Sequence, residues 1–181
     1  MLRRHFTLAL VTCAVALSAC GGAQSSPAPA TTTEAAPVGQ VRKDEVDNAA
    51  VNGFVEAFDK VTQGAVSSLV DKGSEQGLRL CELSLPRLVL TVAASETESP
   101  YLEVRIPIAG QDQAAVREAL ADCMAVLDEG ATEQAQAALD DAYDASKATD
   151  AAPVTAGKVR MSFAYAEDGT LTGLTLAKTE S

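Results

Sequence analysis

The spacing of hydrophobic residues predicts a helix at the start of the folded part of the chain. We expect this helix to begin near Asp44, whose carboxylate can cap the following turn, and to end at Gly73. Apolar side chains recur along it at steps of three and four residues, which places them on one face. These residues are Val51, Phe54, Phe58, Val61, Ala65 and Leu69. Phe54 and Phe58 could line a ligand site, but such a pair more often anchors a helix to a sheet, so we interpret both as core.

Three aliphatic segments then predict an antiparallel sheet. They span residues 78–83, 88–94 and 102–108. Pro86 separates the first two segments, and the polar residues 95–100 form a turn before the third. In the third segment, aliphatic residues occupy every second position. This pattern predicts strands with one buried face and one solvated face.

The next part of the chain returns to helical spacing, with an interruption at Glu129 and Gly130. Its first apolar stripe consists of Val116, Ala119, Leu120, Cys123 and Leu127. Its second stripe consists of Ala135, Ala138, Leu139, Ala142 and Tyr143. We therefore expect two helices, with Cys123 and Tyr143 on their buried sides.

The chain closes with a predicted β-hairpin. Apolar residues occupy alternate positions from Val159, and residues 167–170 contain Asp-Gly, a strong signal for a tight turn before Leu171 begins the return strand. The whole pattern predicts an α+β fold in the order α-β-β-β-α-α-β-β. In this fold, an antiparallel sheet of about five strands packs against three helices.

The first residues of the chain have the parts of an export signal. Arg3 and Arg4 are positively charged, and residues 6–17 form an apolar stretch that is too short to span a bilayer stably. Paired arginines also occur in twin-arginine signals, whose passengers cross the membrane already folded. They are common in general secretory signals too, and we favour the general route.

The tetrad Leu17-Ser18-Ala19-Cys20 resembles the lipobox of bacterial lipoproteins. The resemblance implies cleavage before Cys20, lipid on its thiol, and anchoring on the extracytoplasmic face of the cell membrane. An ordinary secretory signal that happens to contain a cysteine is the alternative. We divide the chain into a signal peptide (1–19), a lipid-anchored linker (20–41) and one α+β domain (42–181). The linker is rich in Ala, Thr, Ser, Pro and Gly, which is typical of a disordered tether.

The residue types that remain after cleavage argue against catalysis. The only histidine, His5, belongs to the signal peptide, which excludes Ser-His-Asp and Cys-His catalytic sets and imidazole metal ligands. The mature chain has no GxSxG, SxxK, GxGxxG or GxxxxGKS motif. We therefore expect no enzyme and no cofactor, with paired carboxylates or a lysine base as the open alternatives. Asp140, Asp141 and Asp144 lack the spacing of a calcium loop, so we assign no metal site.

Two cysteines remain in the domain, because Cys13 leaves with the signal and Cys20 takes lipid. Cys81 and Cys123 both fall at apolar, inward-facing positions of a protein in an oxidising compartment. A disulfide between them would stabilise the domain by on the order of 4 kcal/mol in the chain-entropy model. Two separate buried thiols are the alternative, and we favour the disulfide.

Charge is distributed unevenly along the chain, whose formal net charge is −11. Such an acidic protein repels nucleic acid, which we exclude as a partner. The second helical region is strongly acidic, whereas Arg105, Lys158 and Arg160 are predicted to project from the sheet face opposite the helices. These three residues are a candidate binding face for an anionic partner. A simply solvated face is the more common meaning of such a charge pattern.

The sequence therefore favours a membrane-anchored, non-catalytic module that binds a protein or peptide at the cell envelope. The alternative is a carrier for a small apolar ligand or lipid, for which a thin, alanine-rich core could leave a cavity. A tightly packed core would favour the module, and carboxylates that converge in a cleft would favour an enzyme.

Overall fold

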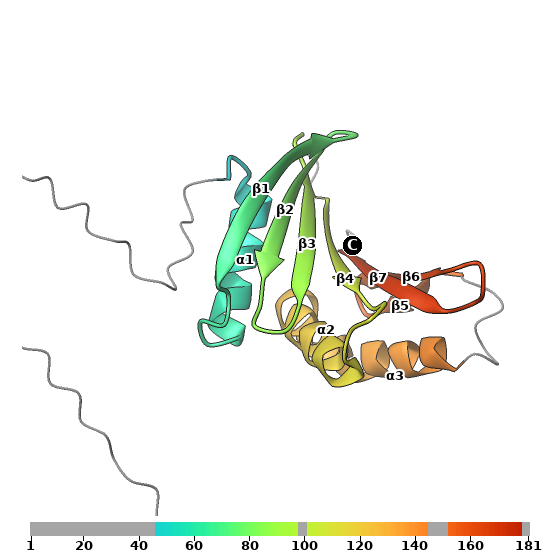
Figure 1. Cartoon of the computed structure of the whole chain (residues 1–181). Coiled ribbons are helices and arrows are strands. Elements are labelled where there is room, and N and C mark those ends of the chain that lie inside the picture. The colour runs from blue at the N-terminus through green and yellow to red at the C-terminus, as the bar shows by residue number, and fades with distance from the viewer. Residues whose placement is uncertain (1–45, 98–100, 145–151, 179–181) are drawn as a thin grey trace, which may run out of the picture. The chain divides into compact units, whose positions relative to one another are not determined.

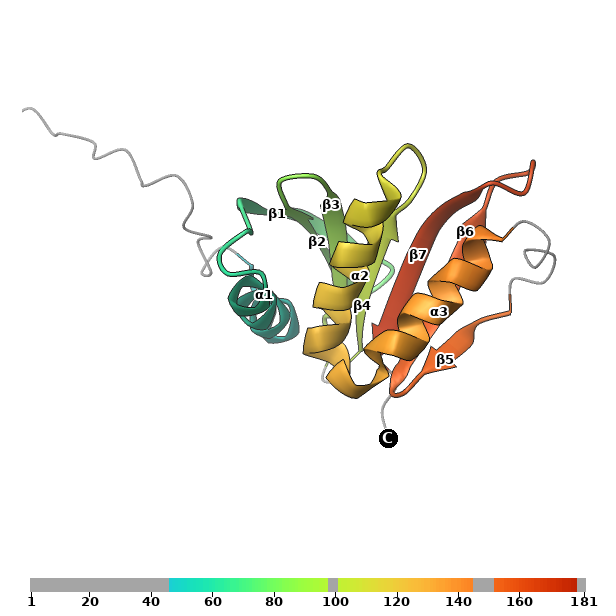
Figure 2. The same ribbon diagram turned by 90° about the horizontal axis from the view of Figure 1, so that it is seen from below.

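Seven antiparallel strands form one sheet, and three α-helices pack against one of its faces (Figures 1 and 2). This arrangement is seen in the computed structural model, which describes residues 46–97, 101–144 and 152–178. The helices are α1 (Ala49–Val61), α2 (Gln113–Leu127) and α3 (Thr132–Tyr143), with the 3₁₀ turn η1 (Glu129–Ala131) before α3. The strands are β1 (Ser68–Glu75), β2 (Leu78–Ser84), β3 (Val89–Ser95), β4 (Leu102–Pro107), β5 (Val154–Ala156), β6 (Val159–Tyr165) and β7 (Leu171–Lys178). Across the sheet their order is β1-β2-β3-β4-β7-β6-β5.

The α+β class is as predicted, but the sheet has seven strands rather than about five. The predicted strands correspond to β2, β3, β4, β6 and β7, and the two that the pattern missed are β1 and β5. Both lie at the edges of the sheet, where only one side of a strand must pair. Five of the eight residues in β1 are polar or charged, and β5 is only three residues long. Neither segment therefore shows the regular apolar alternation that identifies a strand.

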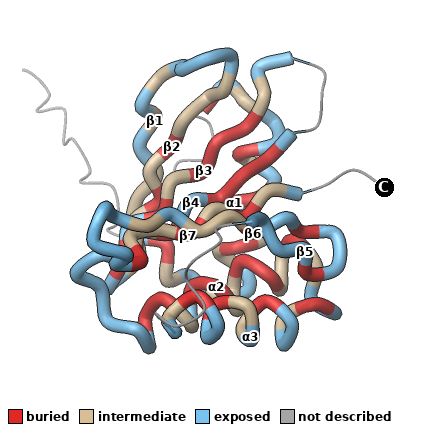
Figure 3. The backbone as a smooth tube through the Cα atoms, turned by 90° about the vertical axis from the view of Figure 1, so that its right-hand side faces the viewer, coloured by how far each residue is buried: buried red, intermediate tan, exposed pale blue. Residues whose placement is uncertain are grey.

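The hydrophobic core lies between the sheet and the helices. Alternate residues of the central strands point into it, among them Leu90, Val92, Val104, Ile106, Leu174 and Leu176. The helices contribute, among others, Val51, Phe58, Val116, Leu120, Met124 and Leu139. Figure 3 shows the result as buried segments along β3, β4 and α2. Burial of each large apolar side chain stabilises the fold by roughly 1.5–3 kcal/mol, so this layer is what holds the helices on the sheet.

The start of α1 is capped by Asn48. Its side-chain oxygen accepts hydrogen bonds from the backbone amides of Ala50 and Val51, each at 3.0 Å. Its side-chain nitrogen donates to the carbonyl of Ser95 at the end of β3 (3.0 Å), which ties the helix start to the sheet. The predicted cap, Asp44, lies outside the described residues.

The end of α1 was predicted wrongly. The helix stops at Val61 rather than Gly73, and residues 68–75 form the edge strand β1 instead. Gln63 and Gly64 adopt left-handed backbone conformations (φ 55° and 83°), which a continuing α-helix does not allow.

Phe54 and Phe58 are core residues, as predicted. Only 4% of Phe54 and none of Phe58 is exposed, and their rings stack with centroids 5.5 Å apart. The pair therefore anchors α1 to the sheet.

The two later helices were also predicted correctly, and their junction packs closely against the β5–β6 hairpin. Asp128, which follows α2, accepts a hydrogen bond from the backbone amide of Lys158 (2.8 Å). Gly157 lies so close to Asp128 and Ala131 that a side chain would collide with them. None of the described helices is both long and apolar enough to cross a membrane.

Candidate functional site

A surface pocket lies where the C-terminal end of α1, the turn between β2 and β3, and the first half of α2 meet. Its volume is about 520 Å³, a size typical of small-ligand sites. It is lined by Val61, Thr62, Gln63 and Ala65 after α1, by the turn Leu85-Pro86-Arg87-Leu88, and by Ala115, Glu118, Ala119 and Asp122 of α2. We call it the α1–α2 pocket.

Local hydrogen bonds shape the rim of the α1–α2 pocket. The hydroxyl of Thr62 donates to the carbonyl of Phe58 (2.9 Å) where α1 ends. In the β2–β3 turn, the amide of Leu85 donates to the carbonyl of Leu88 (2.8 Å). On the α2 side, Ala115 and Ala119 are buried but small, so they leave space between the two packed helices.

Two carboxylates on α2 give the pocket its negative charge. Glu118 and Asp122 are one helical turn apart, so they share a face of α2. Glu118 is exposed, whereas Asp122 is half-buried. Burial, and then the neighbouring charge of Glu118, raise the pKa of Asp122 above its usual value. Among the ion pairs of the described residues, none includes either carboxylate.

Arg87 is the one cationic side chain that lines the α1–α2 pocket. It comes from the exposed part of the β2–β3 turn. In the part of the chain that the structure describes, it has no ion-pair partner either. The lining therefore carries two negative charges and one positive charge when all three groups are ionised.

A second cavity, of about 420 Å³, lies at the far end of the helical layer. The loop after β4, the end of α3 and the β6–β7 turn surround it. Tyr143, predicted as a core residue, contributes to its lining while packing against the core. The Tyr143 hydroxyl is buried without a hydrogen-bond partner among the described residues, and burial raises its pKa. Among the described residues that line the cavity, Asp168 is the one charged group, and its carboxylate accepts a hydrogen bond from the backbone amide of Thr170 (2.9 Å).

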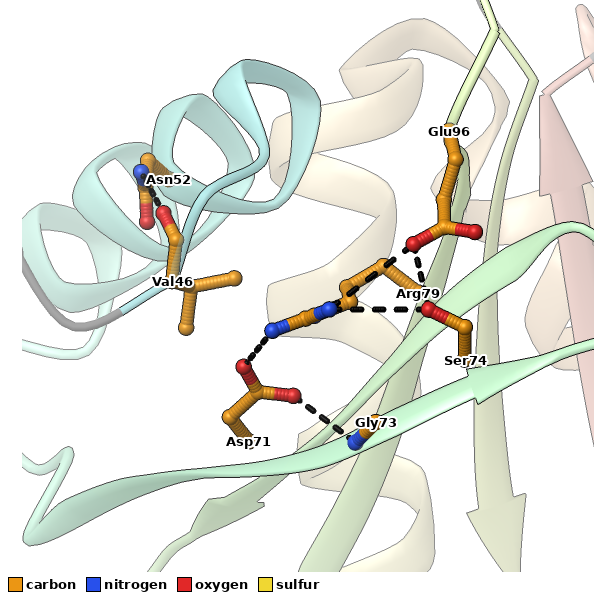
Figure 4. A network of polar contacts seen from close by, with 7 residues as sticks. All are labelled: Val46, Asn52, Asp71, Gly73, Ser74, Arg79 and Glu96. Carbon is orange, nitrogen blue, oxygen red and sulfur yellow. Dashed lines mark hydrogen bonds and ion pairs between the residues drawn. The ribbon is translucent and has the colours of Figure 1, made fainter.

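A network of charged and polar side chains joins the β1–β2 hairpin to the end of β3 (Figure 4). The guanidinium of Arg79 forms an ion pair with Asp71 and lies 3.8 Å from Glu96. Asp71 also accepts a hydrogen bond from the amide of Gly73 (2.8 Å), and Ser74 donates to Glu96. The hydrogen bonds from Gly73 and Arg79 lower the pKa of Asp71. Because these charges satisfy one another, we interpret the network as structural.

Two polar atoms of the residues drawn in Figure 4 are buried without a hydrogen-bond partner among the described residues. They are the Nε of Arg79 and the Oδ1 of Asn52 on α1, whose side-chain nitrogen donates to the carbonyl of Val46 (2.8 Å). Figure 4 shows these residues on neighbouring parts of β2 and α1.

The predicted binding face is only partly a basic surface. Arg105 and Arg160 lie on strands β4 and β6, but Lys158 lies in the β5–β6 turn rather than in a strand. Arg105 donates to the carboxylate of Glu103 (2.7 Å), which also accepts a hydrogen bond from Tyr101 (2.5 Å). Glu103 is only 7% exposed, and its carboxylate forms an ion pair with the guanidinium of Arg105. Burial, and then Glu103, raise the pKa of Tyr101 to about 12. The carboxylate of Glu103 therefore offsets the positive charge of Arg105.

The predicted disulfide is absent from the structure: Cys81 and Cys123 are both buried free thiols. Cys81 lies on β2, next to the edge of the sheet, whereas Cys123 lies on α2, which packs chiefly against α1, α3 and β4. β3 lies between β2 and β4 in the sheet, and both cysteines belong to the hydrophobic core. Burial raises the pKa of Cys81 to about 11 and raises that of Cys123 further. Neither thiol therefore forms a reactive thiolate at neutral pH.

The acidic residues at the end of α3 include one that is paired with α2. Asp140 is paired with Arg117 of α2, and this ion pair links the two helices. Within the described ranges, no group of three or more Cys, Asp or Glu side chains is placed to hold a metal ion.

The α1–α2 pocket was not predicted from the sequence. Its lining comes from three segments that are far apart along the chain, and nothing local links Arg87 to Asp122. The one available signal was on α2 itself, where Glu118 and Asp122 flank the small residue Ala119. That spacing places two carboxylates beside a gap in the helix surface.

Comparisons with protein-family models, with curated proteins and with solved structures find no match to this chain.

Proposed function

We propose that the chain is a membrane-anchored, extracytoplasmic lipoprotein whose α+β domain is a non-catalytic module for binding a protein or peptide. The observation that carries this proposal is the α1–α2 pocket. It opens at the surface, it has an apolar wall, and its half-buried Asp122 has no ion-pair partner among the described residues. A partner side chain that enters the pocket would cover the apolar wall and offset the unpaired charge.

The pocket favours binding of a protein segment over transport of a small apolar ligand. A carrier buries most of its ligand in a largely apolar cavity. Here the α1–α2 pocket is open to solvent and carries Glu118, Asp122 and Arg87 in its lining. These charged groups would be desolvated by an apolar ligand without compensation.

Two carboxylates in one pocket are also a minimal set for acid–base chemistry. In glycoside hydrolases, for example, the two catalytic carboxyl groups lie on either side of the bond that is cleaved. Glu118 and Asp122 instead project from the same face of α2, so they approach an occupant from one side. We therefore favour binding over catalysis.

The anchoring part of the proposal predicts that Cys20 carries the lipid. Replacing Cys20→Ala should move the protein from the membrane fraction to the soluble extracytoplasmic fraction, because the domain has no described membrane-spanning helix to hold it there. The wild-type protein should show the mass of a diacylated N-terminal cysteine, and the variant should not. A variant that stays in the membrane fraction would contradict lipid anchoring at this position.

The binding part can be tested by site-specific photo-crosslinking in the cells that make the protein. A photo-reactive residue in place of Val61, at the rim of the pocket, should yield a discrete crosslinked partner. The same residue in place of Val154, on β5, is the matched control, because the two side chains are 39% and 40% exposed. Equal products at both positions, or none at Val61, would argue against this pocket as the binding site.

A further inference from the structure

We infer that the α1–α2 pocket takes a basic side chain, lysine or arginine, from an exposed segment of the partner. This inference rests on the proposed function and adds the chemistry of the group that is recognised. It follows from the combination of an apolar wall, an unpaired carboxylate pair and an acidic protein.

The carboxylates set the charge of the occupant. Asp122 is half-buried and Glu118 lies one turn away, so α2 presents two negative charges that no described cation offsets by an ion pair. Moving a carboxylate partly out of water is unfavourable unless a cation or hydrogen-bond donors replace the water. An incoming ammonium or guanidinium group supplies both.

The apolar wall sets the shape of the occupant. Val61, Ala65 and Leu88 line the pocket around the carboxylates, together with Ala115 and Ala119 at its α2 side. Lysine and arginine have an aliphatic stem and a charged head, and they bury the stem against apolar surface while the head stays near polar groups. A bare metal ion would use the carboxylates but not the wall, and an aliphatic side chain would use only the wall.

The charge of the whole protein favours the same partner. The formal net charge is −11, which produces a negative potential around the domain. Such a potential raises the association rate of a basic segment and lowers that of an acidic one. Arg87 acts in the opposite direction, because it is the cation that lines the pocket from the β2–β3 turn. Its removal should therefore strengthen binding of a basic side chain.

The experiment uses the full lipidated chain in nanodiscs and blocked pentapeptides of the form acetyl-Ala-Ala-X-Ala-Ala-amide. X is lysine, arginine, norleucine or glutamate, and binding is followed by the amide NMR signals of α2. The norleucine peptide keeps the aliphatic stem and lacks the charge. We expect the lysine or the arginine peptide to bind at least tenfold more tightly than the norleucine peptide, and the glutamate peptide to bind more weakly still. The stronger of the two basic peptides identifies the preferred head group.

Protein variants test whether this preference comes from the pocket. Asp122→Asn and Glu118→Gln should each weaken binding of the preferred basic peptide by about tenfold or more, the usual loss when a charged hydrogen-bond partner is removed. Glu133→Gln removes the same charge from an exposed position on α3 and should leave the affinity unchanged. Arg87→Gln should tighten binding.

Equal affinities for the lysine, arginine and norleucine peptides would overturn the inference. So would equal losses in Asp122→Asn and Glu133→Gln. If either of these results is found while the wild-type protein still gives the Val61 crosslink, the binding module stands and only the basic side chain is wrong. If the Val61 product is absent from the wild-type protein as well, the proposed function itself fails.

Discussion

Asp122 lies half-buried on α2, and burial raises the pKa of its carboxyl group. A raised pKa means that the folded protein holds this proton more tightly than the unfolded chain does. The contribution of Asp122 to the free energy of unfolding is therefore fully present below the pKa that this carboxyl group has in the unfolded chain. It is lost as the pH rises through the higher pKa of the folded protein. At neutral pH the ionised carboxylate opposes folding while it is available to bind a cation.

Because the ionised carboxylate of Asp122 opposes folding, its removal should stabilise the protein, whereas removal of a carboxylate that stabilises the fold should not. Asp122→Asn cannot ionise, so it should be more stable than the wild type at pH 7, and the difference should shrink below about pH 4. Chemical denaturation at a series of pH values measures both quantities. A variant that is less stable at pH 7 would show that the carboxylate stabilises the fold rather than the bound partner.

Gly157 is the position where a single methyl group should do the most damage. Its φ of +57° is unfavourable for other residues, and an added Cβ would lie 2.7 Å from the Cβ of Ala131 and closer still to Asp128. Gly157→Ala should therefore destabilise the protein by about 2 kcal/mol or more, from backbone strain plus the collision. Gly169→Ala is the control, because it has a φ of +81° but no atom within 4 Å of the added Cβ. Equal losses in the two variants would show that the contact with Asp128 and Ala131 is unimportant.

At the scale of elements, α1 is held at its start by polar contacts and along its length by apolar ones. Asn48 caps the helix and also donates to the carbonyl of Ser95, and the stacked Phe54 and Phe58 bury its inner side. Because α1 forms one wall of the pocket, its position determines the width of that pocket. By fixing the start of α1, the Asn48 cap therefore helps to set the position of the pocket wall at the other end of the helix.

The two roles of Asn48 can be separated by substitution. Asn48→Ala should lower the free energy of unfolding by about 1 kcal/mol for the cap, and by a further amount for the lost bond to Ser95. Asn48→Asp keeps the acceptor that caps the helix but loses the donor to Ser95, so its stability should fall between wild type and alanine. Urea denaturation measures the three values. Equal stability of the aspartate and alanine variants would mean that the cap contributes little.

At the scale of the whole molecule, the helices and the sheet enclose a core with two separate cysteines. Cys81 lies under the β1–β2 side and Cys123 lies in α2, and both are fully buried. Their pKa values are raised by burial, to about 11 for Cys81. The fold therefore protects both thiols even in an oxidising compartment, since oxidation requires an accessible thiolate.

Alkylation of the protein purified from its own cells tests this directly. Without reductant, the native protein should take no label at Cys81 or Cys123, and the denatured protein should take two. Intact mass spectrometry counts the labels, and prior reduction serves as the control. A denatured protein that takes label only after reduction would mean that the disulfide predicted from the sequence forms during export.

The sequence by itself determined the elements whose signal is local. Alternating apolar residues identified β4 and β6, helical stripes identified α2 and α3, and the Phe54–Phe58 pair was recognised as core. These predictions hold because burial of one face imposes a period on each segment, whatever the rest of the chain does. The lipobox resemblance at Cys20 is equally local, and it stays a prediction.

Only the tertiary structure decided the features that depend on distant segments. β1 is a strand because β2 offers it a hydrogen-bonding edge, although its residues could also continue the helical stripe of α1. In the structure, Cys81 on β2 and Cys123 on α2 are separate buried thiols. The α1–α2 pocket exists because α1, the β2–β3 turn and α2 meet around small side chains. Periodicity describes one segment at a time, whereas edge pairing, thiol separation and pocket formation depend on which segments the fold brings together.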